Sequence, residues 1–485
     1  MSKTKVWRAG ALLVGLSLIA AACGDDDDAG SDSVAVDDTE AVTEVSGAEP
    51  EATVEETTPP EETAVETTEA EGTETTESEG TVAAPEGDGA LEGLKATTPL
   101  VELSADFTDR LLEVDPELTD YNYAAETYDA VTVIALAAEQ AQDDGIAYAS
   151  LINGITRDGE ACTDYASCKA IIDAGGDVDY DGFSGPLEFA GNGEPLQASY
   201  GLLQTGADNR IDSSLTEYFP ASAPAEADVP EVPVEGTRAG DGTLTIGTIL
   251  PQTGSLAFLG PPEFAAFDLA IQDINAAGGV LGKDVVGIPG DSGDATTDTA
   301  NQTVDRLLSQ NVDAIIGAAS SGVSLTVIDK IVGAGVVQFS PANTSKTLSN
   351  YPDKGLYFRT APSDILQGAV LGEIIAGDGN ATVAIIARND SYGTGLVEDA
   401  TAALTEAGVE VVETTIYAED AQTFDAEVAA TIAAAPDAVL LIAFDEASKI
   451  LTTMVEQGIG PKDIPIYGTD GFAGNAVGEN FDAGT

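Results

Sequence analysis

The most regular feature of the sequence is an alternation of short apolar runs with helical segments over residues 243–485. The apolar run at 243–250 predicts a buried strand. From about residue 262, apolar side chains recur at spacings of three and four, which predicts a helix that ends at the glycine pair 278–279. Short apolar strands separated by helices are typical of parallel sheets covered on both faces, and such sheets bind ligands at the carboxyl ends of their strands. Further strands are predicted at 285–288, 312–316, 336–340, 382–387, 409–416, 438–442 and 464–467.

Residues 89–220 follow a different pattern. They contain one long helical region, about 121–141, and two short strand-like pieces, 187–189 and 198–204. These strands are too few to build a sheet of their own, so this block is expected to complete another fold. A Pro/Ala/Glu-rich linker, 221–242, separates it from the second block.

The N-terminus predicts export. Three basic residues are followed by the apolar run 9–22 and then by Cys23. The run is too short to span a bilayer comfortably and is typical of a secretory signal peptide, 1–23. The small residues before Cys23 resemble a lipobox, which predicts an extracytoplasmic protein anchored to the cell membrane by lipid on Cys23. A plain secretory cleavage with an incidental cysteine is the alternative.

Charge and composition narrow the possible partners. The formal charge is −67, which argues against a nucleic-acid partner because phosphates would be repelled. Between Asp25 and Asp88 there are 23 acidic residues and no Lys or Arg, so 24–88 is predicted to be a disordered acidic tether. The chain has no histidine, which argues against a metal site and histidine-based catalysis. No cofactor is expected. In an oxidising compartment, Cys162 and Cys168 are expected to form a disulfide.

Several segments then carry a family resemblance. The second block resembles the beginning and middle of the branched-chain amino-acid-binding (leucine/isoleucine/valine-binding-like) periplasmic binding proteins of ABC transporters. The segments that carry it are "IGTILPQTGSLAFLG", "FDLAIQDINAAGGVLGK", "GAASSGVSLTV", "SPANTS", "YFRTAPSDILQG", "ARNDSYGTGL" and "IYGTDGF". The first block resembles the C-terminal part of the same family through "YAAETYDAVTVIALAAEQA" and "YDGFSGPLEFAGNGEP".

The family's tail therefore precedes its head in this chain. A circular permutation, a fusion of fragments from two tandem copies and a sequence-assembly artefact would each give this order. Because the pieces complement each other, we expect a single fold, which surface termini permit. The resemblance implies an α/β type I periplasmic-binding fold with two Rossmann-like lobes and a hinge. It places 243–358 and 89–178 in lobe I, and 361–470 and 181–212 in lobe II.

The resemblance also places a ligand site between the lobes. A free amino acid needs donors for its carboxylate and an acid for its ammonium. Ser321, Thr344 and the backbone at Ala342 follow two strands of the first lobe, where a helix N-terminus favours a carboxylate. Capping is the alternative role for these hydroxyls. Asp470 matches the acid that pairs with the ammonium, although it could instead stabilise a turn.

The remaining candidates are aromatic and apolar. Tyr392 is a candidate for stacking on the ligand or hydrogen bonding to it, and Leu259, Phe444 and Tyr123 are expected to form walls. Each could equally be an ordinary core or rim residue. An aliphatic ligand side chain suits this lining, and relatives of the family bind amides, ureas or aromatic acids.

These observations predict a monomeric solute-binding lipoprotein that captures a small amino acid, with the branched-chain type favoured, and delivers it to an ABC permease/ATPase complex. A ligand-sensing module for amides, urea or other small solutes is the alternative. An enzyme on the same fold is disfavoured, because the sequence has no G-x-S-x-G elbow, phosphate-binding loop or histidine. A non-functional rearranged product would fail to unfold as one cooperative unit.

Overall fold

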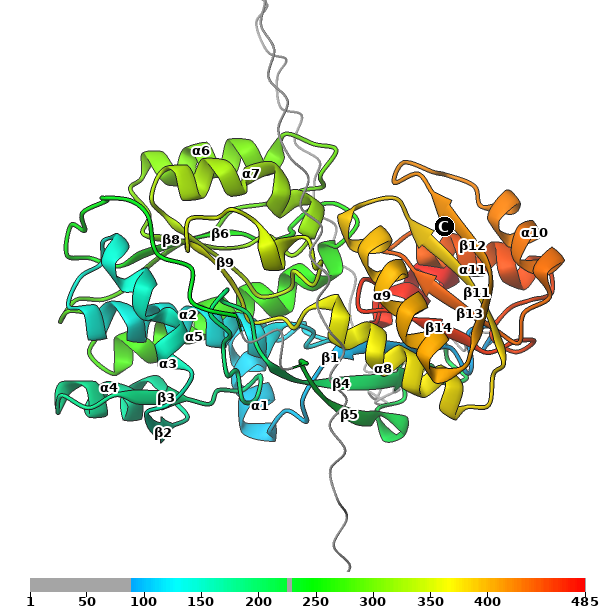
Figure 1. Cartoon of the computed structure of the whole chain (residues 1–485), viewed down its shortest axis with the longest axis horizontal. Helices are drawn as coiled ribbons and strands as arrows, with labels where there is room; N and C mark the ends of the chain where they lie inside the picture. Colours follow the sequence, from blue (N-terminus) through cyan, green and yellow to red (C-terminus); the bar gives the residue numbers. More distant parts are fainter. Residues whose placement is uncertain (1–88, 225–228, 485) are drawn as a thin grey trace, which may run out of the picture. The chain divides into compact units, whose positions relative to one another are not determined.

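The computed structural model describes residues 89–224 and 229–484. The predicted signal peptide, Cys23 and the predicted acidic tether lie outside the described residues. Within the described part, every helix is too short or too polar to cross a membrane. The described chain forms two lobes, each built around one sheet (Figure 1).

The first lobe contains a parallel five-stranded sheet. Its strands, in spatial order, are β10 (Tyr357–Arg359), β9 (Val337–Ser340), β8 (Ala314–Gly317), β6 (Thr245–Ile249) and β7 (Val286–Ile288). Side chains alternate between the two faces along a strand, so both faces of β8 are apolar and both must be covered. Ile315 packs against α6 (Thr299–Ser309) and α7 (Ser321–Gly333), whereas Ile316 packs in the core formed with α2 (Ala124–Ala141) and α5 (Gly260–Ala276) (Figure 1).

The first block supplies much of this lobe's lower layer. Helix α2 has almost every residue buried and packs against α5, β8 and β9, beside α1 (Ala105–Val114). Tyr148, in the 3-10 helix Ile146–Leu151, donates a 2.8 Å hydrogen bond to the Asp313 carbonyl. The short helices α3 (Ile152–Ile155) and α4 (Tyr165–Asp173) follow, with the two-stranded sheet β2 (Glu160–Cys162) and β3 (Val178–Tyr180). A disulfide joins Cys162 to Cys168.

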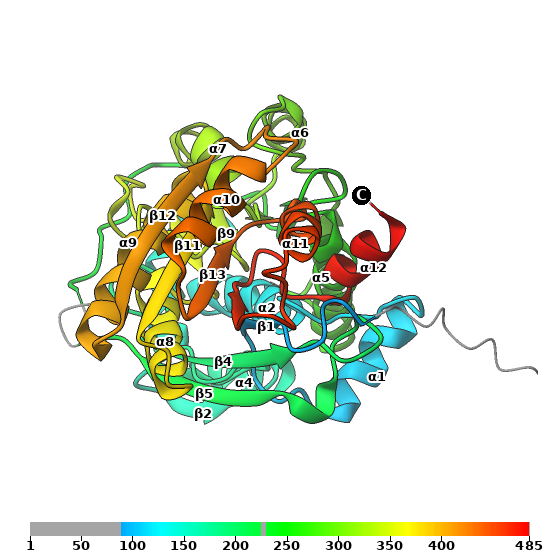
Figure 2. The same cartoon turned by 90° about the vertical axis from the view of Figure 1, so that its right-hand side faces the viewer.

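The second lobe contains a seven-stranded sheet drawn from both blocks. Its order is β12 (Glu410–Tyr417), β11 (Thr382–Arg388), β13 (Ala438–Ile442), β14 (Ile466–Gly468), β1 (Lys95–Pro99), β4 (Gln197–Gln204) and β5 (Glu217–Ser222). Helices α8 (Asp364–Gly377) and α9 (Ser391–Ala407) cover one face, and α10 (Asp425–Ala434) and α11 (Ala447–Glu456) cover the other (Figure 2). Helix α12 (Asn475–Ala483) packs beside α11.

Strand β1 corrects one sequence-based assignment. Residues 89–178 were expected in the first lobe, but β1 pairs with β14 in parallel and with β4 antiparallel, within the second sheet. The β1 sequence KATTP is buried from its second residue onward, so it needs a strand on each side, and β14 offers a free edge. The chain enters the first lobe only after Pro99. The strand-like piece at 187–189 is also corrected, since it makes only an isolated bridge, Phe189 to Pro195.

Both ends of the described chain meet on one side chain. The buried Asn209 accepts a 2.9 Å hydrogen bond from the Leu91 N–H and donates a 2.8 Å bond to Asp482. Residues 91 and 482 therefore lie next to each other, although almost the whole described chain separates them in sequence.

Four segments connect the sheets of the two lobes. Three of them are the segments 100–104, 181–196 and 360–363. A buried ion pair fastens the segment 181–196 to the end of β10, which leads into 360–363, because the Arg359 guanidinium contacts Glu194 and the Arg359 N–H donates to the Gly193 carbonyl at 2.9 Å.

The fourth connection leads from β5 to β6. We call its residues 229–243 the strap. The strap pairs with the crossing segment at Gly191, which donates to the Val229 carbonyl at 3.1 Å and accepts from the Val232 N–H at 3.0 Å. It is then fastened to the first lobe, where Arg238 forms an ion pair with Asp313 at 2.7 Å. The strap is thus an ordered part of the fold over these residues.

Candidate functional site

The eight residues predicted to bind a ligand line one small cavity between the lobes. After β8 and β9, the first lobe contributes Ser321, Ala342 and Thr344; after β11, β13 and β14, the second contributes Tyr392, Phe444 and Asp470. Every one of these positions follows the carboxyl end of a parallel strand, which is where the fold gathers loop side chains. Leu259 and Tyr123 complete the eight, and the sequence reasoning did not identify Leu256, Ala319, Ser320 and Gly471, which also line the cavity.

One wall of the cavity carries hydroxyl and amide donors. Ser320 caps α7 by accepting a 3.3 Å hydrogen bond from the Val323 N–H, which leaves Ser321 buried in the first turn. Thr344 is also buried, in the loop after β9. The Ala342 N–H is already bonded to the Ser340 hydroxyl at 3.2 Å, so Ala342 contributes a surface and not a free backbone donor. This wall suits an anionic group, because the N-terminus of α7 adds its positive partial charge.

The opposite wall carries a buried carboxylate. Asp470 accepts hydrogen bonds of 2.8 Å from the hydroxyls of Tyr123 and Tyr392, one on each oxygen. Burial raises the pKa of Asp470, and the two tyrosine hydroxyls oppose that shift by stabilising the charged form. Tyr392 also stacks on Phe444, with ring centroids 5.4 Å apart. The two tyrosines therefore hold Asp470 in place from different lobes.

A second buried acid stands beside Asp470 and was not among the sequence candidates. Asp364 opens α8, is fully buried, and has its pKa raised well above the ordinary range by burial and then by the charge of Asp470. Thr344 and the charge of Arg359 favour its ionised form, but neither oxygen accepts a hydrogen bond of normal geometry. The sequence contains Asp364 within "PSDILQG", where an acid in the first helical turn has an ordinary stabilising role.

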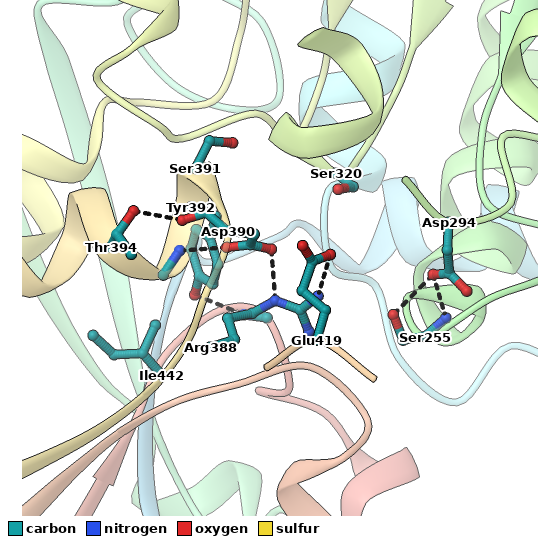
Figure 3. Close-up of polar contacts among 12 residues, drawn as sticks. Ser255, Asp294, Ser320, Arg388, Asp390, Ser391, Tyr392, Thr394, Glu419 and Ile442 are labelled. Carbon is teal, nitrogen blue, oxygen red and sulfur yellow. Dashed lines mark hydrogen bonds and ion pairs between the residues drawn. The ribbon is translucent and has the colours of Figure 1, made fainter. Parts of the chain in front are cut away.

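An arginine supports the aromatic wall from outside the cavity. The Arg388 guanidinium lies 3.5 Å from the centre of the Phe444 ring. Figure 3 shows Arg388 between Asp390 and Glu419, with N–O distances of 2.6 and 3.6 Å, and Glu446 makes a third ion pair at 2.6 Å. Three carboxylates thus offset its charge. Arg388 positions Phe444 and is not available to bind an anion, a role that the sequence gave no signal for.

The cavity is almost filled by the side chains around it. Its volume is about 10 Å³, which is space for about one water molecule. Several contacts hold the lobes together around it. The Ser345 hydroxyl donates to the Ser391 carbonyl at 2.7 Å, and Lys346 forms ion pairs with Glu398 and Asp399 at 2.9 Å each. Because an amino acid is larger than this space, it could enter only when the lobes move apart.

The two walls of the cavity differ in their polar groups. Ser321 and Thr344 on the first lobe face the Asp470 carboxylate of the second lobe, with apolar side chains between them. Among residues 89–224 and 229–484, no group of three or more acidic or cysteine side chains is arranged to hold a metal ion.

Comparison with known proteins divides the chain as the sequence does. The "Periplasmic binding protein" family matches residues 243–483, and the "Receptor family ligand binding region" matches residues 88–208. The Leu/Ile/Val-binding protein homolog 7 of Brucella abortus is 27% identical over 248 residues, which cover 49% of this chain and 61% of that protein. An amino acid binding protein of Pseudomonas aeruginosa is 28% identical over 243 residues, covering 49% and 64%.

A solved structure is also similar. The branched-chain amino acid transporter substrate-binding protein of Streptococcus pneumoniae, in complex with isoleucine, is 26% identical with a TM-score of 0.44, covering 49% of this chain and 67% of that one. The chain spans about 61–63% of the length of the curated relatives it matches first.

Proposed function

From the type I periplasmic-binding fold of this chain, we propose that it captures a small amino acid between its lobes for an ABC importer. The branched-chain type is favoured. The observation that carries the proposal is the opposition of two poles across one cavity, with Ser321 and Thr344 on one lobe and Asp470 on the other. A zwitterionic amino acid has the complementary charges.

We assign a role to each buried group from its position at one of these two poles. The ligand carboxylate lies against Ser321, Thr344 and the first turn of α7. The ligand ammonium lies against Asp470. An ammonium has three N–H donors, and Asp364, whose oxygens lack hydrogen bonds of normal geometry, supplies a second acceptor beside Asp470.

The lining between the poles favours an aliphatic side chain. Leu256, Leu259 and Phe444 present apolar surface to the cavity. A hydrophobic pocket distinguishes ligands that differ by one methylene by about 1–3 kcal/mol. Leucine, isoleucine and valine should therefore bind with different affinities, and amides or urea, which lack the carboxylate, should bind more weakly.

We also propose that the chain order is permuted and that lipid on Cys23 anchors the protein outside the cytoplasm. Three observations support a permutation. Residues 89–220 resemble the family's C-terminal part but precede the segment that resembles its beginning and middle, the ends meet on Asn209, and the strap connects β5 to β6. The proposed boundaries are 1–23 for the signal peptide, 24–88 for the tether, 89–220 for the family's C-terminal segment, 221–242 for the linker and 243–485 for its N-terminal segment. Strand β5 ends at Ser222, two residues inside that linker.

Thermal unfolding of the purified protein against leucine, isoleucine, valine, acetamide and urea tests the function. A ligand present at a thousandfold over its Kd stabilises the native state by about 4 kcal/mol, an easily measured shift. We expect the branched-chain amino acids to raise the Tm. A shift produced by the amides alone would replace the amino acid with the alternative ligand class, and the absence of a shift with any of the five compounds would exclude both ligand classes.

A pair of variants locates the binding. Asp470→Asn keeps the size of the side chain and removes its charge, so we expect at least a tenfold weaker affinity for the amino acid by calorimetry. Asp463→Asn is the matched control, because Asp463 is exposed in the loop before β14, at the opposite end of the strands. Equal affinities in the two variants would contradict the assignment of Asp470.

A further inference from the structure

A second and larger pocket lies on the outer side of the same wall. Its volume is about 220 Å³, and we call it the outer pocket. The first lobe forms one side and the second lobe the other, with a lining of Gly254, Ser255, Ala257, Phe258, Asp445, Phe472, Ala476, Val477 and Asn480. It has room for a single aromatic ring with a short side chain, whereas the cavity is too small for one.

The outer pocket and the cavity share their walls. Leu256 faces the cavity, whereas its neighbours Ser255 and Ala257 face the outer pocket. In the second lobe, Phe444 and Gly471 face the cavity. Their neighbours Asp445 and Phe472 face the outer pocket. One layer of chain therefore separates the two spaces.

The outer pocket exists because the lobes are together. The Asp445 N–H donates a 3.3 Å hydrogen bond to the Ser255 carbonyl across the interface. Ser255 is itself held by Asp294, which accepts bonds of 2.9 Å from its N–H and its hydroxyl (Figure 3). Separation of the lobes would divide the lining between two surfaces, so an occupant must favour the closed form.

The lining has an apolar body and one acidic end. Phe258, Phe472 and Val477 supply apolar and aromatic surface, and Asp445 supplies a carboxylate. Burial and then the neighbouring charge of Glu446 raise the pKa of Asp445 to about 6, and Asp294 acts in the same direction. Lys449 is the cation that opposes them, and it has the smallest effect. A ligand that brings a positive charge would relieve this repulsion.

We infer that the outer pocket is a second binding site, for a small organic cation with an aromatic or apolar body, and that its occupant stabilises the closed lobes. The aromatic body packs between Phe258 and Phe472, and the cation pairs with Asp445. Since closure also forms the cavity, the occupant and the cavity's ligand strengthen each other's binding by the same factor. The inference rests on the lining of the outer pocket and holds whichever solute the cavity takes.

Phenethylamine is the probe, and 2-phenylethanol is its uncharged match. We expect calorimetry on the full chain, in 150 mM salt to screen the general acidity, to detect phenethylamine binding at least tenfold tighter than 2-phenylethanol. Asp445→Asn should remove that preference, whereas Asp463→Asn, at an exposed acid away from the pocket, should keep it. Equal affinities for the amine and the alcohol in the unaltered protein would overturn the assignment of charge.

Three further variants locate the amine. Ala476→Leu fills the outer pocket and should abolish binding, while Ala483→Leu, an exposed position on the same helix, should not change it. Thr344→Val alters the cavity alone and should leave the amine's affinity unchanged. Binding that survives Ala476→Leu but fails in Thr344→Val would place the amine in the cavity and refute the second site. The amino-acid series described above tests the cavity separately, so the two proposals can fail independently.

Discussion

Two buried glutamates on facing helices should make the protein less stable as the pH rises. Glu126 on α2 and Glu263 on α5 are both buried, and neither oxygen of Glu263 has a hydrogen-bond partner. Burial raises the pKa of Glu126 from 4.5 to about 8, and the charge of Asp129 acts in the same direction. Burial and then Glu126 raise the pKa of Glu263 as well.

The sign and size of the effect follow from linkage. A carboxyl group whose pKa is higher in the folded state binds its proton more tightly there, so its contribution to stability is complete below about pH 4.5 and is lost as the pH rises to about 8. At about 1.4 kcal/mol for each pH unit, the loss for Glu126 is about 3 kcal/mol at pH 7 and about 5 kcal/mol above pH 8.

Glu126→Gln keeps the shape of the side chain and cannot ionise. Urea unfolding at pH 5, 7 and 8.5 should therefore show a variant that is close to the unaltered protein at pH 5, and more stable by about 3 kcal/mol at pH 7 and about 5 kcal/mol at pH 8.5. Glu113→Gln is the control, because Glu113 is an exposed residue on α1 of the same lobe. A stability difference that stays constant from pH 5 to 8.5 would refute the reasoning.

Two further changes test the framework of the fold. Arg359→Met should cost about 3–5 kcal/mol in urea unfolding at pH 7, because it leaves the buried Glu194 carboxylate without its cation; a loss below 1 kcal/mol would mean that the ion pair contributes little. Replacing Cys162 and Cys168 with serine should cost about 2 kcal/mol, as expected for a small closed loop, and a thiol reductant should lower the stability of the unaltered protein by the same amount but leave the variant unchanged.

The fold could be predicted because its central strands are continuous apolar runs in the sequence. The type I periplasmic-binding fold is confirmed. The predicted strand at 438–442 coincides with β13, and the run at 382–387 falls one residue short of β11. Strands buried on both faces must be continuously apolar, and this pattern survives without knowledge of their neighbours. Strand β1 could not be recognised in this way, because KATTP has no apolar run and becomes a strand only through β14 and β4.

The candidate site likewise contains residues that the sequence predicted and residues that it did not. Residues that follow predicted strands, such as Ser321 and Asp470, could be placed near one another because parallel strands end at one edge of a sheet. Asp364 and Arg388 could not be placed near the site from the sequence. An acid in the first turn of a helix has a local role that needs no ligand, and only the folded chain shows that Asp364 is buried beside Asp470. Arg388 gains its role from the ring of Phe444 and from three acids, the farthest of which lies 58 positions from it in the sequence.

The meeting of the two chain ends on Asn209 decides which lobe is joined to the segment before residue 89. Residues 89–94 lead directly into β1 of the second sheet, at the end of its strands that lies opposite the cavity. Any segment that precedes residue 89 is therefore attached to the second lobe. If the lobes move apart, Asp470 keeps its place relative to that attachment, whereas Ser321 and Thr344 move with the first lobe.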